Sequence, residues 1–265
     1  NGSVQEGIWE NDAFLYAKKS NPNNSSQTPK VAKTDDSKFY PVASGSGFAV
    51  SSSGHVVTNN HVIDGCGYVK IHNNGETIRA TILHRDPLND LAVLKGSFVP
   101  SKVFKISRKN PELMQDVFVS GYPFGNHVSS SVKVTKGIVS SLTGLGNNVS
   151  NMQIDAALQP GNSGGPIFDD GGNVIGVAVA KLDLKKVVTD WGVVPENTNF
   201  GIKSNVVVNL LESNGISIQE ANSASLSNTE LGKIMSGATY YLSCWMTMAQ
   251  VEKLRTKKVM FEDLE

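Results

Sequence analysis

Short apolar runs, each bounded by turn-forming residues, constrain the fold of this chain more than any other feature. They recur from about residue 44 onwards. Runs of this length and spacing are typical of strands in an antiparallel barrel or sandwich. Two sets of about six runs, separated by a polar interval at residues 102–111, predict an all-β fold of two six-stranded antiparallel β-barrels. The first set covers 46–50, 55–58, 68–72, 77–84 and 91–94, and the second covers 115–121, 130–142, 152–155, 167–168, 174–180 and 200–202.

The two ends of the chain lack this pattern. Apolar residues within Ser3–Lys19 predict a short helix, and residues 20–38 are rich in Asn, Ser, Pro and Lys, which is typical of a linker. Val206–Leu211 predicts a closing helix, and the apolar stretch Tyr240–Met246 could add a strand. We therefore expect an N-terminal extension and linker at 1–40, the double barrel at 41–212, and a C-terminal extension at 213–265.

Composition excludes several classes of function. Lys plus Arg and Asp plus Glu both number 24, so no net charge favours binding to nucleic acid or to an anionic membrane. No apolar run reaches the ~18 residues of a membrane span. We expect no metal and no cofactor, because no His, Cys and Asp residues have ligand spacing. The chain starts at Asn1 and not at a methionine, so any signal peptide lies outside it.

Glycines flank a serine in Gly161-Asn162-Ser163-Gly164-Gly165-Pro166. Glycine permits the tight bends that hold a serine hydroxyl outward and turn backbone N–H groups towards a bound oxygen. Such a turn suits a nucleophile, although an ordinary hairpin turn of the same composition is the alternative.

A serine nucleophile needs a neutral imidazole as base and a carboxylate to orient that imidazole. All five histidines precede Ser163, which excludes an α/β-hydrolase, in which the histidine follows the serine. His61 has the best context, because it ends an apolar run, and a side chain at a strand end faces a cleft more readily than one inside a strand. The other four, which we expect to be structural or surface residues, are His55, His72, His84 and His127.

The carboxylate is less sharply defined by the residues alone. Asp90 directly precedes the apolar run Leu91–Leu94 and is favoured over Asp86, which lies beside Pro87 and resembles a turn residue. Asp155, which lies nearer to Ser163 in the sequence, remains a rival.

Five ordered motifs together resemble the protease domain of the HtrA (Deg) family of trypsin-like serine proteases, over about Gly45–Asn209. They are Gly45-Ser46-Gly47-Phe48, Val56-Val57-Thr58-Asn59-Asn60-His61-Val62-Ile63, Asn89-Asp90-Leu91-Ala92-Val93-Leu94, Gly121-Tyr122-Pro123-Phe124-Gly125 and Asp155–Pro166.

The resemblance implies a chymotrypsin-like double barrel with its site between the barrels. It implies a serine endopeptidase with His61 as base, Asp90 as orienting acid and Ser163 as nucleophile, acting through an acyl-enzyme. Oxyanion donors would be the N–H groups of Gly161 and Ser163, with Asn162 as a third candidate. It further implies polypeptide substrates, a role in protein quality control and the bacterial periplasm. Residues 216–265 do not resemble the PDZ domain usual in this family, so a homo-oligomer is left open.

In trypsin-like folds the floor of the S1 pocket lies six residues before the nucleophile, which is Ala157 here. The pocket floor would then carry no negative charge to bind a Lys or Arg side chain, and Leu158 would narrow the pocket. We expect cleavage after small or medium aliphatic residues, with the pocket wall formed by Val177, Ala178, Val179 and Ala180.

Cys66 and Cys244 are too few for a disulfide scaffold, and the sequence leaves one bridge or two free thiols open. Two other functions are also considered. One is a catalytically silent, peptide-binding or chaperone-like scaffold of the same fold. The other is a cysteine hydrolase using Cys66 with His72, His84 or His127, which lacks a matching oxyanion turn.

Overall fold

The computed structural model describes residues 7–10, 13–17, 37–73, 75–125, 131–180 and 197–254, the first two ranges by their backbone only. It divides into two compact units, Asn1–Thr34 and Asp35–Glu265. Within the described ranges, no helix is long and apolar enough to cross a membrane.

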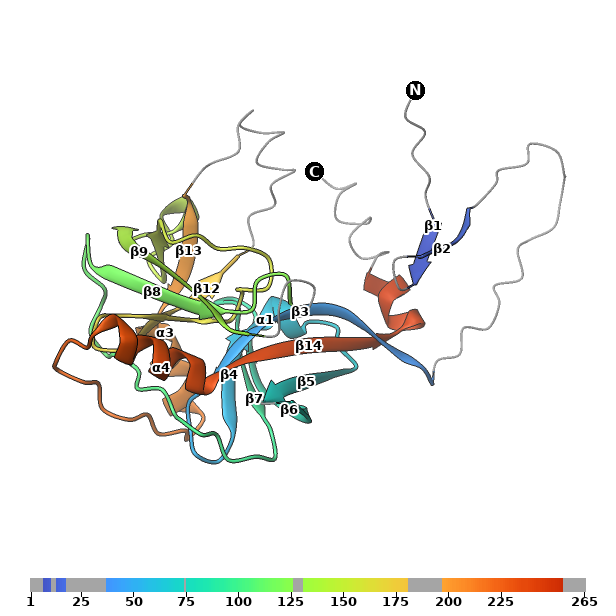
Figure 1. Ribbon diagram of the computed structural model, residues 1–265, viewed down its shortest axis with the longest axis horizontal. Coiled ribbons are helices and arrows are strands. Elements are labelled where there is room, and N and C mark those ends of the chain that lie inside the picture. The colour runs from blue at the N-terminus through green and yellow to red at the C-terminus, as the bar shows by residue number, and fades with distance from the viewer. Residues whose placement is uncertain are drawn as a thin grey trace, which may run out of the picture. The chain divides into compact units, whose positions relative to one another are not determined.

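The larger unit contains two closed six-stranded antiparallel barrels, as the sequence predicted (Figure 1). The first barrel has the strand order β14-β3-β4-β7-β6-β5. Its core includes Phe48, Ile71 and Leu94, none of which is exposed to solvent. Strand β7 is buried at four successive residues whereas β6 alternates, so β7 lies inside the unit and β6 at its surface. The bounds are β3 (Phe39–Ala49), β4 (His55–Asn59), β5 (Tyr68–Asn73), β6 (Glu76–Asp86), β7 (Leu91–Lys95) and β14 (Thr239–Thr247).

The second barrel has the strand order β10-β13-β12-β11-β8-β9. Its core is built around Val119, Met152, Ile154 and Ile167. The predicted polar interval at residues 102–111 lies between β7 of the first barrel and β8, the first strand of the second barrel. The bounds are β8 (Asp116–Gly121), β9 (Lys133–Ser141), β10 (Asn151–Ile154), β11 (Pro166–Phe168), β12 (Val174–Val179) and β13 (Asn199–Lys203).

Helices cover the outside of the double barrel. The short helix α1 (Asn60–Ile63) follows β4, and the predicted closing helix is α3 (Ser204–Ser213). The sequence analysis missed α4 (Asn228–Ala238), although Ser227 and Glu230 form a capping box at its start. Leu211 of α3 and Leu231 of α4 belong to the larger hydrophobic cluster, which contains residues of both barrels, such as Phe48 and Phe168. A short 3₁₀ helix, η2, covers Leu145–Asn147.

The predicted helix in Ser3–Lys19 is wrong. Strands β1 (Gly7–Glu10) and β2 (Ala13–Ala17) pair as an antiparallel hairpin instead. Ile, Trp, Phe and Tyr favour strands over helices, and this preference outweighs the weak helical spacing of the apolar residues.

The expected C-terminal extension at 213–265 also needs correction. Strand β14 pairs with β3 over Thr239–Thr247 and with β5 over Tyr241–Trp245, and it closes the first barrel. Figure 1 shows β14, in red, running beside β3, in blue. Residues 239–247 therefore belong to the double barrel, because without them the facing edges of β3 and β5 would be unpaired.

A disulfide joins Cys66, which follows α1, to Cys244 in β14. Their Cα atoms are 5.4 Å apart and 178 positions apart in sequence. Both Cys66 and the neighbouring strand β5 contact β14, so the bridge and the strand pairing fasten the same segment. A cross-link over so long a loop removes much conformational freedom from the unfolded chain.

We predict that replacing both cysteines (Cys66→Ser with Cys244→Ser) lowers the free energy of unfolding by about 3–5 kcal/mol, because the long loop is no longer closed. Urea denaturation of wild type with and without reductant measures the effect. Reductant should not change the double variant. An unchanged wild-type midpoint under reductant would show that the bridge does not contribute.

Candidate active site

His61 and Asp90 come from the ends of two paired strands. β4 pairs with β7 up to Asn59 and Leu91, so the residues just beyond this pair lie close together. The Nδ1 atom of His61 is 2.6 Å from Oδ2 of Asp90. The backbone N–H of His61 donates to Oδ1 of the same carboxylate at 2.8 Å. Both carboxylate oxygens of Asp90 therefore hold His61, one through its ring and one through its backbone.

The backbone of Asp90 is fixed as well. Asp90 has φ 54°, an uncommon value for a residue other than glycine. Its carbonyl accepts hydrogen bonds from Asn59 Nδ2 and from the N–H of Asn60, each at 3.0 Å. The sequence analysis missed this role of Asn59, for which the Asn59-Asn60 pair directly before His61 was the available signal.

Ser163 lies in the glycine-rich turn between β10 and β11 and is only 4% exposed. Gly164 within this turn has φ 83°, and a Cβ there would lie 2.2 Å from the carbonyl oxygen of Ser46. Glycine is therefore required for both conformation and space. The Gly164 N–H donates to the carbonyl of Ala178 in β12 at 3.0 Å, which anchors the turn on the second barrel.

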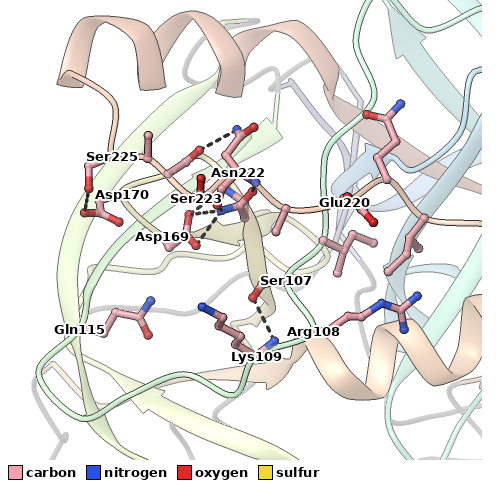
Figure 2. Close-up of a pocket in the computed structure, with 17 residues that line it drawn as sticks. Ser107, Arg108, Lys109, Gln115, Asp169, Asp170, Glu220, Asn222, Ser223 and Ser225 are labelled. Atoms are coloured by element: carbon pink, nitrogen blue, oxygen red, sulfur yellow. Dashed lines mark hydrogen bonds between the residues drawn. The ribbon is translucent and has the colours of Figure 1, made fainter.

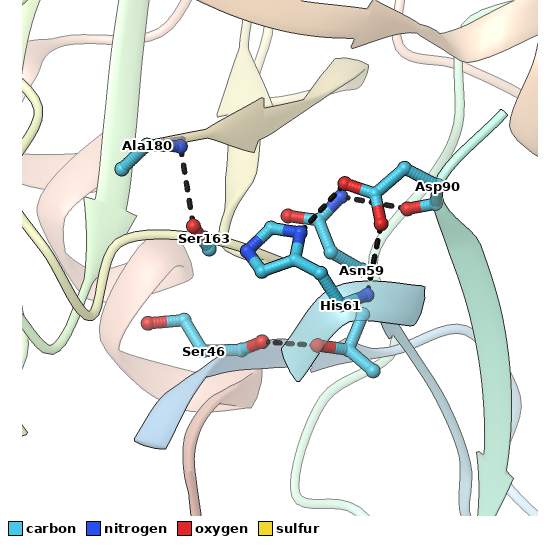
Figure 3. Close-up of polar contacts among 7 residues, drawn as sticks. Ser46, Asn59, His61, Asp90, Ser163 and Ala180 are labelled. Carbon is cyan, nitrogen blue, oxygen red and sulfur yellow. Dashed lines mark hydrogen bonds and ion pairs between the residues drawn. The ribbon is translucent and has the colours of Figure 1, made fainter. Parts of the chain in front are cut away.

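The His61 ring lies between Asp90 and Ser163, with its second nitrogen directed towards the serine (Figure 3). Among the described residues, the hydrogen bond of Ser163 Oγ is with the N–H of Ala180, which donates at 3.2 Å, and not with His61. A hydroxyl that accepts from Ala180 can still donate its own hydrogen. The arrangement thus joins Asp90 to His61 and leaves the hydroxyl hydrogen of Ser163 available.

Two backbone N–H groups of the turn, two residues apart, are available to donate a hydrogen bond. Within the described part of the chain, the N–H groups of Gly161 and Ser163 have no acceptor. The N–H of Asn162 donates to the carbonyl of Gln159 at 2.9 Å. The expectation that Asn162 could supply an oxyanion donor is therefore corrected, because its amide already closes the turn. Gly161 and Ser163 remain as the donors that a negatively charged oxygen could use.

The expected S1 residues are only partly accessible. Ala157 is exposed, and its carbonyl accepts from Thr135 Oγ1 at 3.0 Å. Leu158 is 8% exposed and packs in the core of the second barrel. Val177 and Ala178 are not exposed at all, so their proposed place in the pocket wall is corrected. Both faces of β12 are covered at these two positions. Val179, the last residue of β12, and Ala180, which follows it, are partly exposed.

The other described histidines and acids have structural partners or no role in this arrangement. Burial lowers the pKa of His55, with further lowering from Lys95 and then His84, and its ring bonds Ser51 at 2.7 Å. Burial, and to a smaller extent Lys70, lowers the pKa of His72. His84 lies partly buried in β6, and His127 lies outside the described residues.

Asp155 and Asp86, the two rivals of Asp90, bond local backbone. Oδ1 of Asp155 accepts from the N–H of Ile138 at 2.6 Å, which ties β10 to β9. Oδ1 of Asp86 accepts from the N–H of Asn89 at 3.1 Å, which stabilises the turn before β7. Neither carboxylate bonds a histidine among the described residues.

A polar cavity of about 620 Å³ lies away from these residues, and none of the candidate triad lines it (Figure 2). Its walls bond one another: Asn222 donates to the carbonyl of Gly171 at 3.0 Å, and Ser225 donates to Asp170 at 2.6 Å. In the described ranges, no group of three or more His, Cys, Asp and Glu side chains gathers as metal ligands. His61, Asp90 and Ser163 therefore remain the candidate catalytic residues.

Comparison with known proteins agrees with this geometry. The model of the trypsin-like peptidase domain matches residues 45–177. An uncharacterized protein of Sinorhizobium fredii is 36% identical over 225 residues, which cover 84% of this chain and 35% of that protein. A probable periplasmic serine endoprotease, DegP-like, of Brucella suis is 43% identical over 147 residues, which cover 53% of this chain and 28% of that protein.

The crystal structure of the serine endoprotease from Yersinia pestis is similar with a TM-score of 0.52 and 29% identity, over 64% of this chain and 56% of that one. The chain thus spans about a third of the length of the curated relatives it matches. The predicted resemblance to HtrA-like proteases is confirmed.

We predict that Gly164→Ala destabilises the protein far more than Gly75→Ala. Both glycines have nearly equal positive φ, 83° and 85°, but a Cβ meets nothing within 4 Å at Gly75. A positive φ costs an alanine ~1–2 kcal/mol, and crowding at Gly164 adds ~1–3 kcal/mol. Urea denaturation of the two variants measures this difference. Equal losses would show that the turn has room for a side chain.

Proposed function

Because this chain belongs to the trypsin-like peptidase family and is an HtrA-like serine protease, we propose that it is an endopeptidase working through His61, Asp90 and Ser163. The observation that carries the proposal is the 2.6 Å contact of Asp90 with His61, whose other ring nitrogen is directed towards Ser163. Asp90 accepts from Nδ1–H and thereby leaves Nε2 of His61 as the proton acceptor.

The proposed reaction proceeds in two acyl-transfer steps. Ser163 Oγ attacks the carbonyl carbon of the scissile peptide bond while Nε2 of His61 takes the hydroxyl proton. The carbonyl oxygen becomes negative and is stabilised by the N–H groups of Gly161 and Ser163. Protonated His61 then gives its proton to the leaving amine, and the C–N bond breaks. Water, activated by the same imidazole, hydrolyses the acyl-enzyme.

The alternative is a catalytically silent, peptide-binding scaffold of the same fold. The observation that favours it is the hydrogen bond from Ala180 to Ser163 Oγ, in place of one between Ser163 and His61. Active serine hydrolases often have a long or unformed serine–histidine bond until substrate is bound, so this contact is compatible with activity. We therefore prefer the endopeptidase.

The substrates we propose are polypeptides cleaved after small or medium aliphatic residues. The accessible part of the expected pocket consists of Ala157, Val179 and Ala180, none of which carries a charge. Ala180 also bonds Ser163 Oγ, so the end of β12 adjoins the nucleophile.

An extracytoplasmic site of action is proposed on two grounds. Relatives are named as periplasmic endoproteases. The Cys66–Cys244 disulfide also suits an oxidising compartment.

We predict that Ser163→Ala lowers kcat by about 10⁴–10⁶-fold, because the nucleophile is gone, and that Asp90→Asn lowers it about 10⁴-fold through the wrong imidazole tautomer. Hydrolysis of labelled casein and labelling by a fluorophosphonate measure both effects. Ser213→Ala, an exposed serine at the end of α3, is the matched control and should retain full activity. Wild-type protein that neither cleaves casein nor labels at Ser163 would favour the silent scaffold.

A peptide library should show cleavage after Val, Ala or Leu, because the accessible pocket residues are small and uncharged. Mass spectrometry of the products, with Ser163→Ala as blank, identifies the cleaved bonds. Preferential cleavage after Lys or Arg would refute this specificity without affecting the proposed triad.

A further inference from the structure

We propose that Ser46 is a positioning residue for the oxyanion site, acting from the opposite barrel. The proposal rests on the proposed endopeptidase function. Ser46 lies in β3 of the first barrel and is completely buried. The nucleophile turn that it contacts belongs to the second barrel, between β10 and β11.

Four hydrogen bonds converge on this one serine. Its hydroxyl donates to the carbonyl of Gly161 at 2.7 Å and accepts from the N–H of Tyr122 at 2.9 Å. Its backbone N–H donates to the carbonyl of Ser163 at 2.8 Å. Its own carbonyl accepts from the hydroxyl of Thr58 at 2.7 Å, a bond drawn in Figure 3. Ser46 is thus fixed by Thr58 and in turn holds two carbonyls of the turn.

These two carbonyls belong to alternate peptide units. A peptide unit is planar, and its C=O and N–H point in opposite directions. Ser46 holds the 161–162 unit through the Gly161 carbonyl, so the N–H of Asn162 points away, to the carbonyl of Gln159. It holds the 163–164 unit through the Ser163 carbonyl, so the N–H of Gly164 points to Ala178.

The N–H groups of Gly161 and Ser163, which have no acceptor among the described residues, lie in the two peptide units of the turn that Ser46 does not contact. The carbonyl of Pro160 accepts from the N–H of Phe124 at 2.7 Å, which directs the Gly161 N–H the opposite way. The carbonyl of Asn162 accepts from the N–H of Gly165 at 2.9 Å, which does the same for the Ser163 N–H. The Gly161 and Ser163 N–H groups therefore keep their directions because the peptide units before and after each of them are hydrogen-bonded.

Among the described residues, the hydroxyl of Ser46 bonds the Gly161 carbonyl and the Tyr122 N–H and no other group. In the pairing of β3 with β14, Ser46 lies opposite Tyr241, and this pairing does not involve the Ser46 hydroxyl. A side chain that both donates and accepts is needed to join the Tyr122 N–H to the Gly161 carbonyl, and alanine can do neither. Without it, the 161–162 unit keeps only the bond from the Asn162 N–H to the Gln159 carbonyl, next to a glycine at φ 101°, whose backbone turns readily. This unit lies between the two that carry the Gly161 and Ser163 N–H groups, so the directions of both are then less firmly fixed.

Ser46→Ala should lower kcat by about 10- to 100-fold and change KM by less than about threefold, because loss of one oxyanion donor costs ~10²–10³ in kcat and here the donor is only loosened. The substrate is the best-cleaved peptide of the library. A boronic acid of the same sequence, which places an oxygen at the oxyanion site, should lose affinity by the same factor as kcat/KM. Ser46→Cys, which keeps a side chain of similar shape but is larger and donates only weakly, should act in the same direction.

Ser120→Ala is the matched control. Ser120 is equally buried, and its hydroxyl bonds the hydroxyl of Thr239 at 2.8 Å and not a carbonyl of the turn. It should lower the urea midpoint as a lost buried hydrogen bond does, while kcat and boronate affinity stay within about twofold of wild type.

The proposal would be overturned if both Ser46 variants kept the kcat and boronate affinity of wild type. It would also be overturned if Ser120→Ala lost as much kcat as Ser46→Ala. The two proposals fail separately. If wild type cleaves peptide and labels at Ser163 but the Ser46 variants match it, only the role of Ser46 is refuted. If wild type shows neither activity, the endopeptidase itself is refuted.

Discussion

The turn that carries Ser163 is held from the opposite barrel, and the geometry of the site depends on that contact. The N–H of Ser46 bonds the carbonyl of Ser163 at 2.8 Å, and Gly164 admits the Ser46 carbonyl at a distance that no Cβ would allow. His61 and Asp90 belong to the barrel of Ser46, whereas Ser163 belongs to the other. The same contact that joins the barrels therefore also positions Ser163, the proposed nucleophile, relative to His61, its proposed base.

Closure of the first barrel depends on the far end of the chain. β14 pairs with both β3 and β5, and its disulfide to Cys66 fastens it close to the segment of His61. β3, the strand that provides Ser46, lies between β14 and β4 in the barrel order. Residues 239–247 therefore support the strand from which the nucleophile turn is held, although they lie far from Ser163 in sequence.

The backbone N–H groups of the turn differ in their hydrogen bonding more than the glycine-rich sequence suggests. Six consecutive residues contain three glycines, yet their amides fall into two states: those of Asn162, Gly164 and Gly165 bond carbonyls, and those of Gly161 and Ser163 bond none among the described residues. An oxyanion site needs donors that are directed but unused, because reorientation during the reaction would cost free energy. Bonded neighbours on both sides of each open amide meet that requirement.

The sequence by itself predicted the two barrels, His61 and Ser163, and its family resemblance selected Asp90 over Asp86 and Asp155. Period and spacing of apolar runs depend on local chemistry, and the motifs around His61, Asp90 and Ser163 are short and contiguous. Only the tertiary structure decided that β14 closes the first barrel, that Val177 and Ala178 are buried, and that the amide of Asn162 is occupied. Each of these depends on which distant backbone groups meet. Pairings between residues far apart leave no local trace in composition or spacing, so the hydrogen-bond partner of Ser46 could not be read from Gly45-Ser46-Gly47 alone.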